Sequence, residues 1–257
     1  MARVSVITIV KDHAAGLEVA AYSLFKQSYF DWGLVIVVGK SGDASVAVAQ
    51  GLQQFDPRIV IINQIGSGIY GAMNEGLGIA SGEFIWFMNA GDEFFSKSTL
   101  AQAVNQISKT NSGVVIGGYR VEGANPKRSF HGTDGNVSEW GFAFNRRGGC
   151  HQAMIFQTSC LKEIGGFDTS YSLAADFDLV LRIIQKSRAY RVAEIYATIE
   201  PGGRADQGIF LVHSEKHQIR RRLLGGPIVS FTSFLWTSLA RLKITFRQTL
   251  EYFIWQK

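Results

Sequence analysis

Apolar runs of five to seven residues alternate with amphipathic stretches through the first hundred residues of the chain. The apolar runs are rich in Val and Ile, which is typical of strands buried on both faces. They lie at residues 4–10, 34–38, 58–62 and 83–88. Apolar residues recur at helical spacing in the stretches between them, at residues 14–28, 44–55 and 71–80. Such alternation predicts an α/β fold with a doubly wound, mostly parallel, Rossmann-like sheet.

The pattern is less regular after residue 95. We expect further helices at residues 96–108 and 175–186, and further strands at residues 113–121 and 151–156. A short helix capped by Ser159 should stop at Gly165. Residues 123–149 are rich in Gly, Asn and charge, and a loop of that length in a compact domain is usually functional or mobile. We expect it to close over the substrate.

Composition fits a protein with a substantial core. The chain has 257 residues, of which 46% are hydrophobic and 18% charged, so one large or two small domains are expected. Its two cysteines, Cys150 and Cys160, have neither zinc-ligand nor CxxC spacing. With no pattern of a cleaved signal peptide in the first residues, a reduced cytoplasmic protein is the simplest interpretation.

Positive charge is concentrated at the carboxyl end. Residues 216–257 hold eight Lys or Arg against the single acid Glu251, a net charge of +7, whereas the whole chain carries +5. The uncharged stretch 223–240 is short for a spanning helix and is broken by Gly-Gly-Pro. We therefore predict a basic amphipathic helical tail that attaches peripherally to the inner face of the cell membrane. Packing of the tail on the domain or in a homo-oligomer is the alternative, and a nucleic-acid surface is disfavoured because no known module is present.

Polar clusters follow three of the predicted strands. They lie at residues 39–43, 64–74 and 89–93, and ligands of open α/β sheets bind beyond the carboxyl ends of the strands. The helix near Gly71 offers N–H groups to a phosphate. An acid beside a diphosphate suits a bridging Mg²⁺, with Asp92 as its candidate ligand. A simple turn remains the alternative for Asp92, helix capping for Asp43, and a solvent-facing role for Asn74.

Two further candidates lie later in the chain. Asp176 and Asp178 open a predicted helix, but their spacing of about 200° prevents both from aiming at one point. One of them is therefore a candidate catalytic base, unless both only complement the helix dipole. His151 opens a predicted strand, and a packed or solvent-facing histidine is the commoner case.

Over residues 3–215 the chain resembles the family-2 glycosyltransferases of the inverting type. The resemblance is carried by "VSVITIVKD", "GIYGAMNEG", "NAGDEF", "HQA" and "AADFDL", which occur in the family's order and spacing. It implies a glycosyltransferase A fold, with residues 1–95 as the nucleotide-binding half, 96–215 as the acceptor half and 216–257 as a separate tail. The branch that assembles bacterial exopolysaccharide and lipopolysaccharide is the most similar.

The resemblance also implies residue roles. Asp92 matches the metal ligand for Mg²⁺ or Mn²⁺, Asn89 stands where the first acid of that motif often lies, and Asp176 matches the catalytic base. The implied nucleotide-sugar-binding residues are Val10, Asp12, Gly39, Asp43, Gly68, Asn74, Asn89, Ala90 and Gly91. The implied acceptor-side residues are His151, Gln152 and Arg204. The family usually has acids where this chain has Gly39 and Gly66, so either backbone groups replace the usual uridine contacts or the donor carries a different base. A UDP-sugar is favoured.

The predicted activity is sugar transfer with inversion from a nucleotide-diphosphate sugar to a hydroxyl of a lipid-linked saccharide. A nucleotidyltransferase is the first alternative, but the stretch "IVKDHAAG" lacks the Gly-rich basic loop that this class carries after its first strand. A non-catalytic nucleotide-sugar-binding or scaffold relative is the second alternative. Retention of both Asp92 and Asp176 argues against it.

Overall fold

The structure is a computed structural model, and it describes residues 2–123, 129–130, 132–144, 149–202, 208–227, 229, 231–235 and 237–238. It divides into two compact units, residues 1–201 and 202–257. The predicted boundary after residue 215 falls inside helix α9 (Ile209–Leu224) of the second unit. All candidate site residues that the structure describes belong to the first unit.

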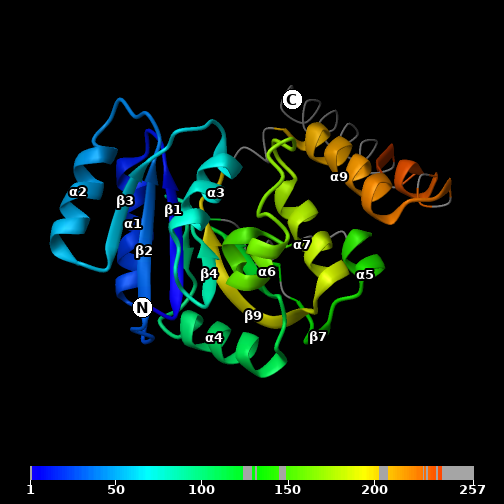
Figure 1. Cartoon of the computed structure of the whole chain (residues 1–257), viewed down its shortest axis with the longest axis horizontal. Coiled ribbons are helices and arrows are strands. Elements are labelled where there is room, and N and C mark those ends of the chain that lie inside the picture. Colours follow the sequence, from blue (N-terminus) through cyan, green and yellow to red (C-terminus); the bar gives the residue numbers. More distant parts are fainter. Residues whose placement is uncertain are drawn as a thin grey trace, which may run out of the picture. The chain divides into compact units, whose positions relative to one another are not determined.

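Four parallel strands form the first half of the sheet (Figure 1). They are β1 (Val4–Val10), β2 (Trp32–Val38), β3 (Ile59–Asn63) and β4 (Phe84–Phe87), in the order β3-β2-β1-β4. The helices that connect them are α1 (Ala14–Phe25), α2 (Ser45–Phe55) and α3 (Ile69–Ile79). Because the strands are parallel, the loops that follow them all lie at one edge of the sheet.

The second half of the sheet is mixed. Its strands are β5 (Glu93–Phe94), β6 (Val114–Val121), β7 (Gly135–Asn136), β8 (Met154–Gln157) and β9 (Ala189–Ile199). Strand β8 runs antiparallel to β4 and β6, and β9 runs parallel to β6 but antiparallel to β5. The accompanying helices are α4 (Thr99–Thr110), α5 (Glu139–Ala143), η2 (His151–Ala153), α6 (Thr158–Glu163) and α7 (Ala175–Lys186).

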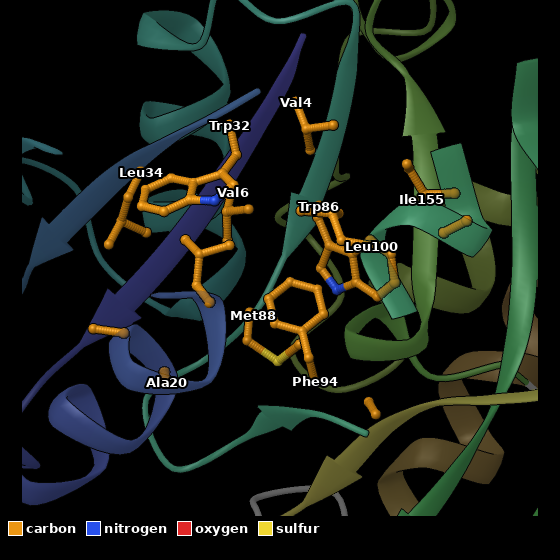
Figure 2. Packing of buried hydrophobic residues seen from close by; sticks show 14 of the residues in the cluster. Val4, Val6, Ala20, Trp32, Leu34, Trp86, Met88, Phe94, Leu100 and Ile155 are labelled. Carbon is orange, nitrogen blue, oxygen red and sulfur yellow. The ribbon is translucent and has the colours of Figure 1, made fainter. Parts of the chain in front are cut away.

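The core is apolar and continuous across the two halves. Figure 2 shows Trp32, Trp86 and Phe94 among aliphatic side chains from strands and helices. The Trp86 ring lies 4.9 Å from the Phe94 ring and 5.6 Å from that of Tyr196, so β4, β5 and β9 are joined by aromatic contacts. This packing fixes the ends of three strands, and candidate site residues lie next to these ends.

The predicted class is confirmed, with corrections in detail. The helix over residues 175–186 forms as predicted. The strand predicted at 151–156 is instead the 3-10 turn η2 followed by β8, and Ser159 lies inside α6, whose N-cap residue is Gln157. Strand β9 was not predicted. The predicted loop 123–149 contains β7 and α5, and part of it lies outside the described residues.

The second unit contains α9 and a following apolar segment. His217 Nδ1 of α9 lies 2.8 Å from the Ser233 hydroxyl, which ties the helix to that segment. Arg221, Arg222, Phe231 and Phe234 are exposed. No helix in the described part of the chain has both the length and the apolar character needed to cross a membrane.

Candidate active site

The loops after β1 and β2 are joined by hydrogen bonds. The N–H of Asp12 donates to the Ser41 hydroxyl at 3.0 Å, and Asp12 Oδ1 accepts the N–H of Gly42 at 2.6 Å. The N–H of Gly39 donates to the carbonyl of Val10 at 2.8 Å. These contacts bring the first predicted nucleotide-binding residues together at the carboxyl edge of the sheet.

Asp43 connects the starts of two helices. Its carboxylate accepts the N–H groups of Ala14, in the first turn of α1, and of Ser45, in the first turn of α2, each at 2.9 Å. Hydrogen bonds from the Ser45 side chain and from these backbone groups hold the pKa of the Asp43 carboxyl below its usual value. Asp43 therefore has a clear role in holding the loop, whether or not it also contacts a nucleotide.

The start of α3 is shaped by glycine and by Glu75. Gly68, at the N-cap, has φ of 79°, and no side chain in the described residues caps the helix there. The Glu75 carboxylate accepts the N–H groups of Ile65 and Gly66 at 2.9 and 2.7 Å. A Cβ at Gly66 would lie 3.1 Å from Glu75 Oε1. Glu75 thus occupies the space beside a position where the family usually has an acid.

A side chain at position 39 would be similarly crowded. A Cβ added to Gly39 would lie 3.2 Å from both Gln64 Oε1 and Lys11 Cβ. Lys11 and Gln64 therefore lie beside the position where the family usually has an acid. The sequence shows that position 39 lacks the acid, but it did not predict that Lys11 and Gln64 lie beside it.

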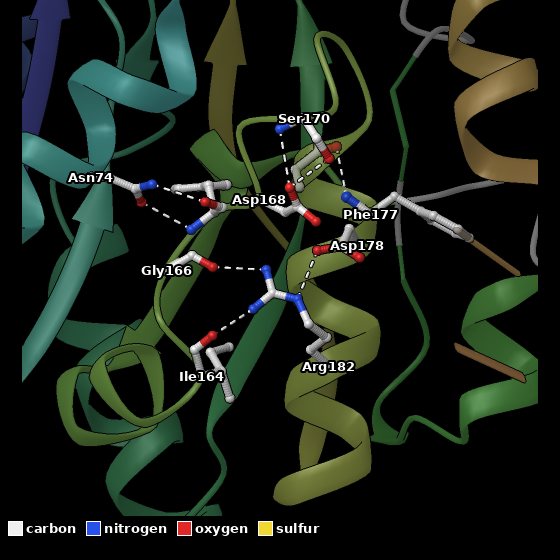
Figure 3. A network of polar contacts seen from close by, with 10 residues as sticks. Asn74, Ile164, Gly166, Asp168, Ser170, Phe177, Asp178 and Arg182 are labelled. Atoms are coloured by element: carbon white, nitrogen blue, oxygen red, sulfur yellow. Dashed lines mark hydrogen bonds and ion pairs between the residues drawn. The ribbon is translucent and has the colours of Figure 1, made fainter. Parts of the chain in front are cut away.

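Asn74 holds the loop that carries Phe167. Its amide nitrogen donates to the carbonyl of Phe167 at 2.8 Å, and its oxygen accepts the Phe167 N–H at 2.9 Å (Figure 3). The Phe167 ring stacks on Tyr70 of α3 at 5.2 Å and meets the His151 ring edge-on at 6.4 Å. Asn74 is therefore engaged with protein backbone rather than facing solvent.

Asp92 is almost fully buried, with 4% of its surface exposed. Its Oδ2 accepts the side-chain N–H of Gln152 at 2.7 Å, and its Oδ1 accepts the backbone N–H of Glu200 at 3.0 Å. Burial raises the pKa of the Asp92 carboxyl to about 6, against the lowering effect of these two hydrogen bonds. A nearby cation would favour the ionised form.

Gly91 makes room for a His–Glu pair that sequence analysis missed. Gly91 has φ of 95°, and a Cβ there would overlap the Glu200 carboxylate and approach His13 Nε2. His13 Nε2 lies 2.8 Å from Glu200 Oε2. Strand β5 pairs antiparallel with β9, so Glu200, just beyond β9, comes to lie beside Asp92. The glycine is therefore required both by the backbone and by this pair.

A second chain of contacts leads from Asn89 to Asp176. Asn89 Nδ2 lies 3.1 Å from His151 Nε2. His151 Nδ1 lies 3.9 Å from Asp176 Oδ2, whereas Asp176 Oδ1 accepts the N–H of Phe177 at 2.7 Å. Both His151 Nδ1 and Asn89 Oδ1 are buried and have no hydrogen-bond partner in the described part of the chain. A buried polar atom left unpaired costs about 1–3 kcal/mol, so these two atoms need an explanation.

Asp178, the neighbour of the candidate base, has a structural role. It is fully buried, and its Oδ2 accepts the Nε–H of Arg182 at 2.7 Å. Arg182 also donates to the carbonyls of Ile164 and Gly166 at 2.8 and 2.7 Å (Figure 3). Of the two acids that open α7, Asp178 therefore fixes the loop before Phe167, and Asp176 faces His151.

The candidate metal ligand Asp92 and the candidate base Asp176 are joined through two adjacent residues. Strand β8 is antiparallel to β4, so the turn that precedes β8 lies beside the carboxyl end of β4. His151 in this turn faces Asp176, and Gln152 bonds to Asp92. Trp86 of β4 donates its indole N–H to the carbonyl of Gln152 at 2.9 Å, which holds the turn in place. Asp92 and Asp176 thus lie at one end of the sheet.

Two predicted site residues, Ala90 and Arg204, remain. Ala90 lies in the same turn as Asp92, and its N–H donates to the Ile9 carbonyl of β1 at 3.2 Å. Arg204 lies outside the described residues.

The oxygen atoms of Asn89 and Asp92 fit a divalent cation. The unpaired amide oxygen of Asn89 and the Asp92 carboxylate are the hard oxygen ligands that Mg²⁺ and Mn²⁺ take. No group of three or more His, Cys, Asp and Glu suited to a metal occurs among the described residues. Mg²⁺ usually needs only one or two carboxylates, because substrate phosphates and water complete its shell.

Solved structures share this fold. TarS from S. aureus in complex with UDP-GlcNAc matches with a TM-score of 0.71 and 18% identity, over 86% of this chain and 65% of that chain. The mannosyltransferase PcManGT from Pyrobaculum calidifontis, in complex with GDP-Man and Mn²⁺, matches with a TM-score of 0.71 and 19% identity, over 93% and 70%. At this identity the likeness establishes the glycosyltransferase A-like fold.

Sequence comparisons identify the family. An uncharacterised glycosyltransferase of Mycobacterium tuberculosis is 31% identical over 195 residues, which cover 70% of this chain and 68% of that protein. The GalNAc(5)-diNAcBac-PP-undecaprenol beta-1,3-glucosyltransferase of Campylobacter jejuni is 36% identical over 110 residues, or 41% of this chain and 36% of that protein. The family model for glycosyl transferase family 2 matches residues 5–162. The chain therefore belongs to glycosyl transferase family 2.

Proposed function

We propose that this glycosyltransferase moves a sugar with inversion from a nucleotide-diphosphate sugar to a hydroxyl of a saccharide acceptor. The observation that carries the proposal is the contact of the adjacent residues His151 and Gln152 with Asp176 and Asp92. This arrangement supports a scheme in which a proton acceptor and a cation ligand act on one substrate. In this scheme residues 1–95 bind the donor, and the acceptor binds to the rest of the first unit, residues 96–201.

Asp176 is the proposed general base. Its Oδ2 takes the proton of the acceptor hydroxyl while the hydroxyl oxygen bonds to the anomeric carbon. The bond from that carbon to the diphosphate oxygen breaks on the opposite face, so the configuration inverts. A positioned base supplies a factor of about 10²–10⁴ in rate, and the remainder comes from orientation and charge stabilisation.

Asp92 and Asn89 are the proposed ligands of Mg²⁺ or Mn²⁺. When bound, the cation neutralises charge on the leaving diphosphate. The Mn²⁺ and GDP-Man in the PcManGT complex, and the UDP-GlcNAc in the TarS complex, support a nucleotide-sugar donor in this fold. The amino end of α3, which begins at Ile69, suits the phosphates. We favour a UDP-sugar. Lys11 and Gln64 would then lie beside the uracil ring, where the family's usual acid is absent.

The proposed acceptor is a lipid-linked saccharide of cell-surface polysaccharide assembly. The name of the Campylobacter jejuni relative describes such an acceptor, which supports the assignment. The exposed Phe231, Phe234, Arg221 and Arg222 of the second unit suit the surface of an anionic bilayer. We therefore place the enzyme at the inner face of the cell membrane, attached through its carboxyl-terminal residues.

A donor screen tests the reaction. The full chain is incubated with a panel of UDP-, GDP- and dTDP-sugars and synthetic polyprenyl-diphosphate-linked saccharides, with and without Mn²⁺, and release of nucleoside diphosphate is measured. We expect metal-dependent release with one donor, and its loss in Asp92→Asn and Asp176→Asn. Glu163→Gln, an exposed carboxylate on α6, is the matched control and should retain full activity. Binding of a donor without any turnover would favour the non-catalytic alternative.

Membrane attachment has a separate test. Co-sedimentation with vesicles containing phosphatidylglycerol should fall for a Phe231→Ser, Phe234→Ser double variant. Phe30→Ser, which changes an even more exposed aromatic residue of the first unit, should sediment like the unmodified chain. Unchanged sedimentation of the double variant would remove the second unit from membrane binding.

A further inference from the structure

His151 is buried, and only one of its two ring nitrogens has a hydrogen-bond partner among the described residues. The residue is 6% exposed, and its ring is met edge-on by Phe167 at 6.4 Å. Asn74 fixes Phe167 through two hydrogen bonds to its backbone. The ring therefore has little freedom to turn, and its two nitrogens face fixed neighbours.

Asn89 determines which nitrogen carries the proton. Its Nδ2 lies 3.1 Å from His151 Nε2. An amide nitrogen donates and does not accept, so Nε2 must accept, and the neutral ring carries its hydrogen on Nδ1. With an acid at position 89, which the family often has, the same nitrogen would instead meet an acceptor.

The Nδ1–H group faces one oxygen of Asp176. Nδ1 has no hydrogen-bond partner among the described residues and lies 3.9 Å from Asp176 Oδ2. Asp176 Oδ1 is already bonded to the N–H of Phe177. A separation of 3.9 Å is longer than a hydrogen bond, but catalytic hydrogen bonds often tighten only when substrate is bound.

We propose that His151 is a positioning residue for Asp176: Asn89 fixes the ring proton on Nδ1, and Nδ1–H holds Asp176 Oδ2 toward the acceptor hydroxyl. The inference rests on the proposed function of Asp176 as general base. It assigns the orphaned Nδ1 a partner in the substrate complex. It also links the turn that carries Asp92 to the base through a single side chain.

Two variants that place an amide nitrogen at one or the other ring-nitrogen position test the proposal. The amide nitrogen of His151→Asn can occupy the place of Nδ1, whereas that of His151→Gln can occupy only the place of Nε2. We expect His151→Gln to lower kcat about 100-fold and His151→Asn to lower it about tenfold. The KM for acceptor and the affinity for donor should be unchanged in both. Equal losses in the two variants, or a loss expressed as a higher acceptor KM, would overturn the proposal.

The tautomer of His151 in the unmodified chain gives an independent readout. Long-range ¹H–¹⁵N spectra distinguish a ring protonated on Nδ1 from one protonated on Nε2, and His151→Asn identifies the signal. We expect the Nδ1–H form, and the Nε2–H form would overturn the proposal even if both variants folded poorly. Absence of sugar transfer by the unmodified chain would instead refute the proposed function, while the tautomer would still be measurable.

Discussion

Replacing Asp92 by Asn should change how the stability of the fold depends on pH. Asp92 has a pKa of about 6 in the folded chain because it is buried, against about 3.9 in an unfolded chain. Between these values the folded chain holds a proton that the unfolded chain has lost. The free energy of unfolding therefore falls as pH rises, and this fall is complete above the folded pKa.

The magnitude follows from the distance between the working pH and the folded pKa. At about pH 5, one unit below that pKa, the protonated carboxyl contributes about 1.4 kcal/mol that is absent at about pH 7.5. Asn does not titrate, and it also places an N–H group against one of the two donors, Gln152 and Glu200, at a cost of about 1–3 kcal/mol. That cost is the same at both pH values, so only the change between them is diagnostic.

Urea unfolding followed by circular dichroism at the two pH values measures this change. Between about pH 5 and about pH 7.5, the free energy of unfolding of the unmodified chain should fall by about 1.4 kcal/mol relative to that of Asp92→Asn. Asp56→Asn is the control. The hydrogen bond from Arg58 lowers the pKa of Asp56, so this substitution should change the free energy of unfolding equally at both pH values. If the unmodified chain and Asp92→Asn change in parallel, the assignment of a raised pKa to Asp92 is refuted.

Three further variants test the framework of the site, with the free energy of unfolding as the measured quantity. Arg182→Met removes the cation from the buried Asp178 and should cost about 3–5 kcal/mol; a loss below about 1 kcal/mol would show that the pair is not needed. Gly91→Ala forces a side chain at positive φ against Glu200 and should cost about 1–3 kcal/mol, so an unchanged melting temperature would contradict the close contact. Asn74→Ala leaves a backbone N–H and C=O unpaired and should cost about 1–3 kcal/mol, whereas a neutral result would mean that water replaces both bonds.

Hydrophobic pattern was sufficient for the elements that are regular and well buried. The apolar run at 4–10 and the helix at 175–186 were predicted with their observed bounds. Strand β9 escaped prediction because exposed and buried residues are mixed along it, without a strict alternation. The turn at His151–Ala153 was taken for strand because an apolar run does not reveal a single tight turn before it.

The candidate site was partly predictable for a similar reason. Polar residues after apolar runs located Asp92 and Asn89, because parallel strands end at one edge. Glu200 was missed because it follows β9, which was itself not predicted. Its partner His13 lies 187 positions away in the sequence, and no spacing rule reports such a contact. Glu75 was missed because its partners are backbone N–H groups, which leave no trace in side-chain composition.

The proposed mechanism depends on Asp176 acting as base on the acceptor hydroxyl, with the sugar donor held beside Asp92. The most direct test is single-turnover transfer of radiolabelled sugar by Asp176→Asn, with nucleotide affinity measured on the same preparation. We expect transfer to fall by a factor of about 10²–10⁴ while donor affinity stays within about twofold of that of the unmodified chain. Transfer at the unmodified rate would contradict the account.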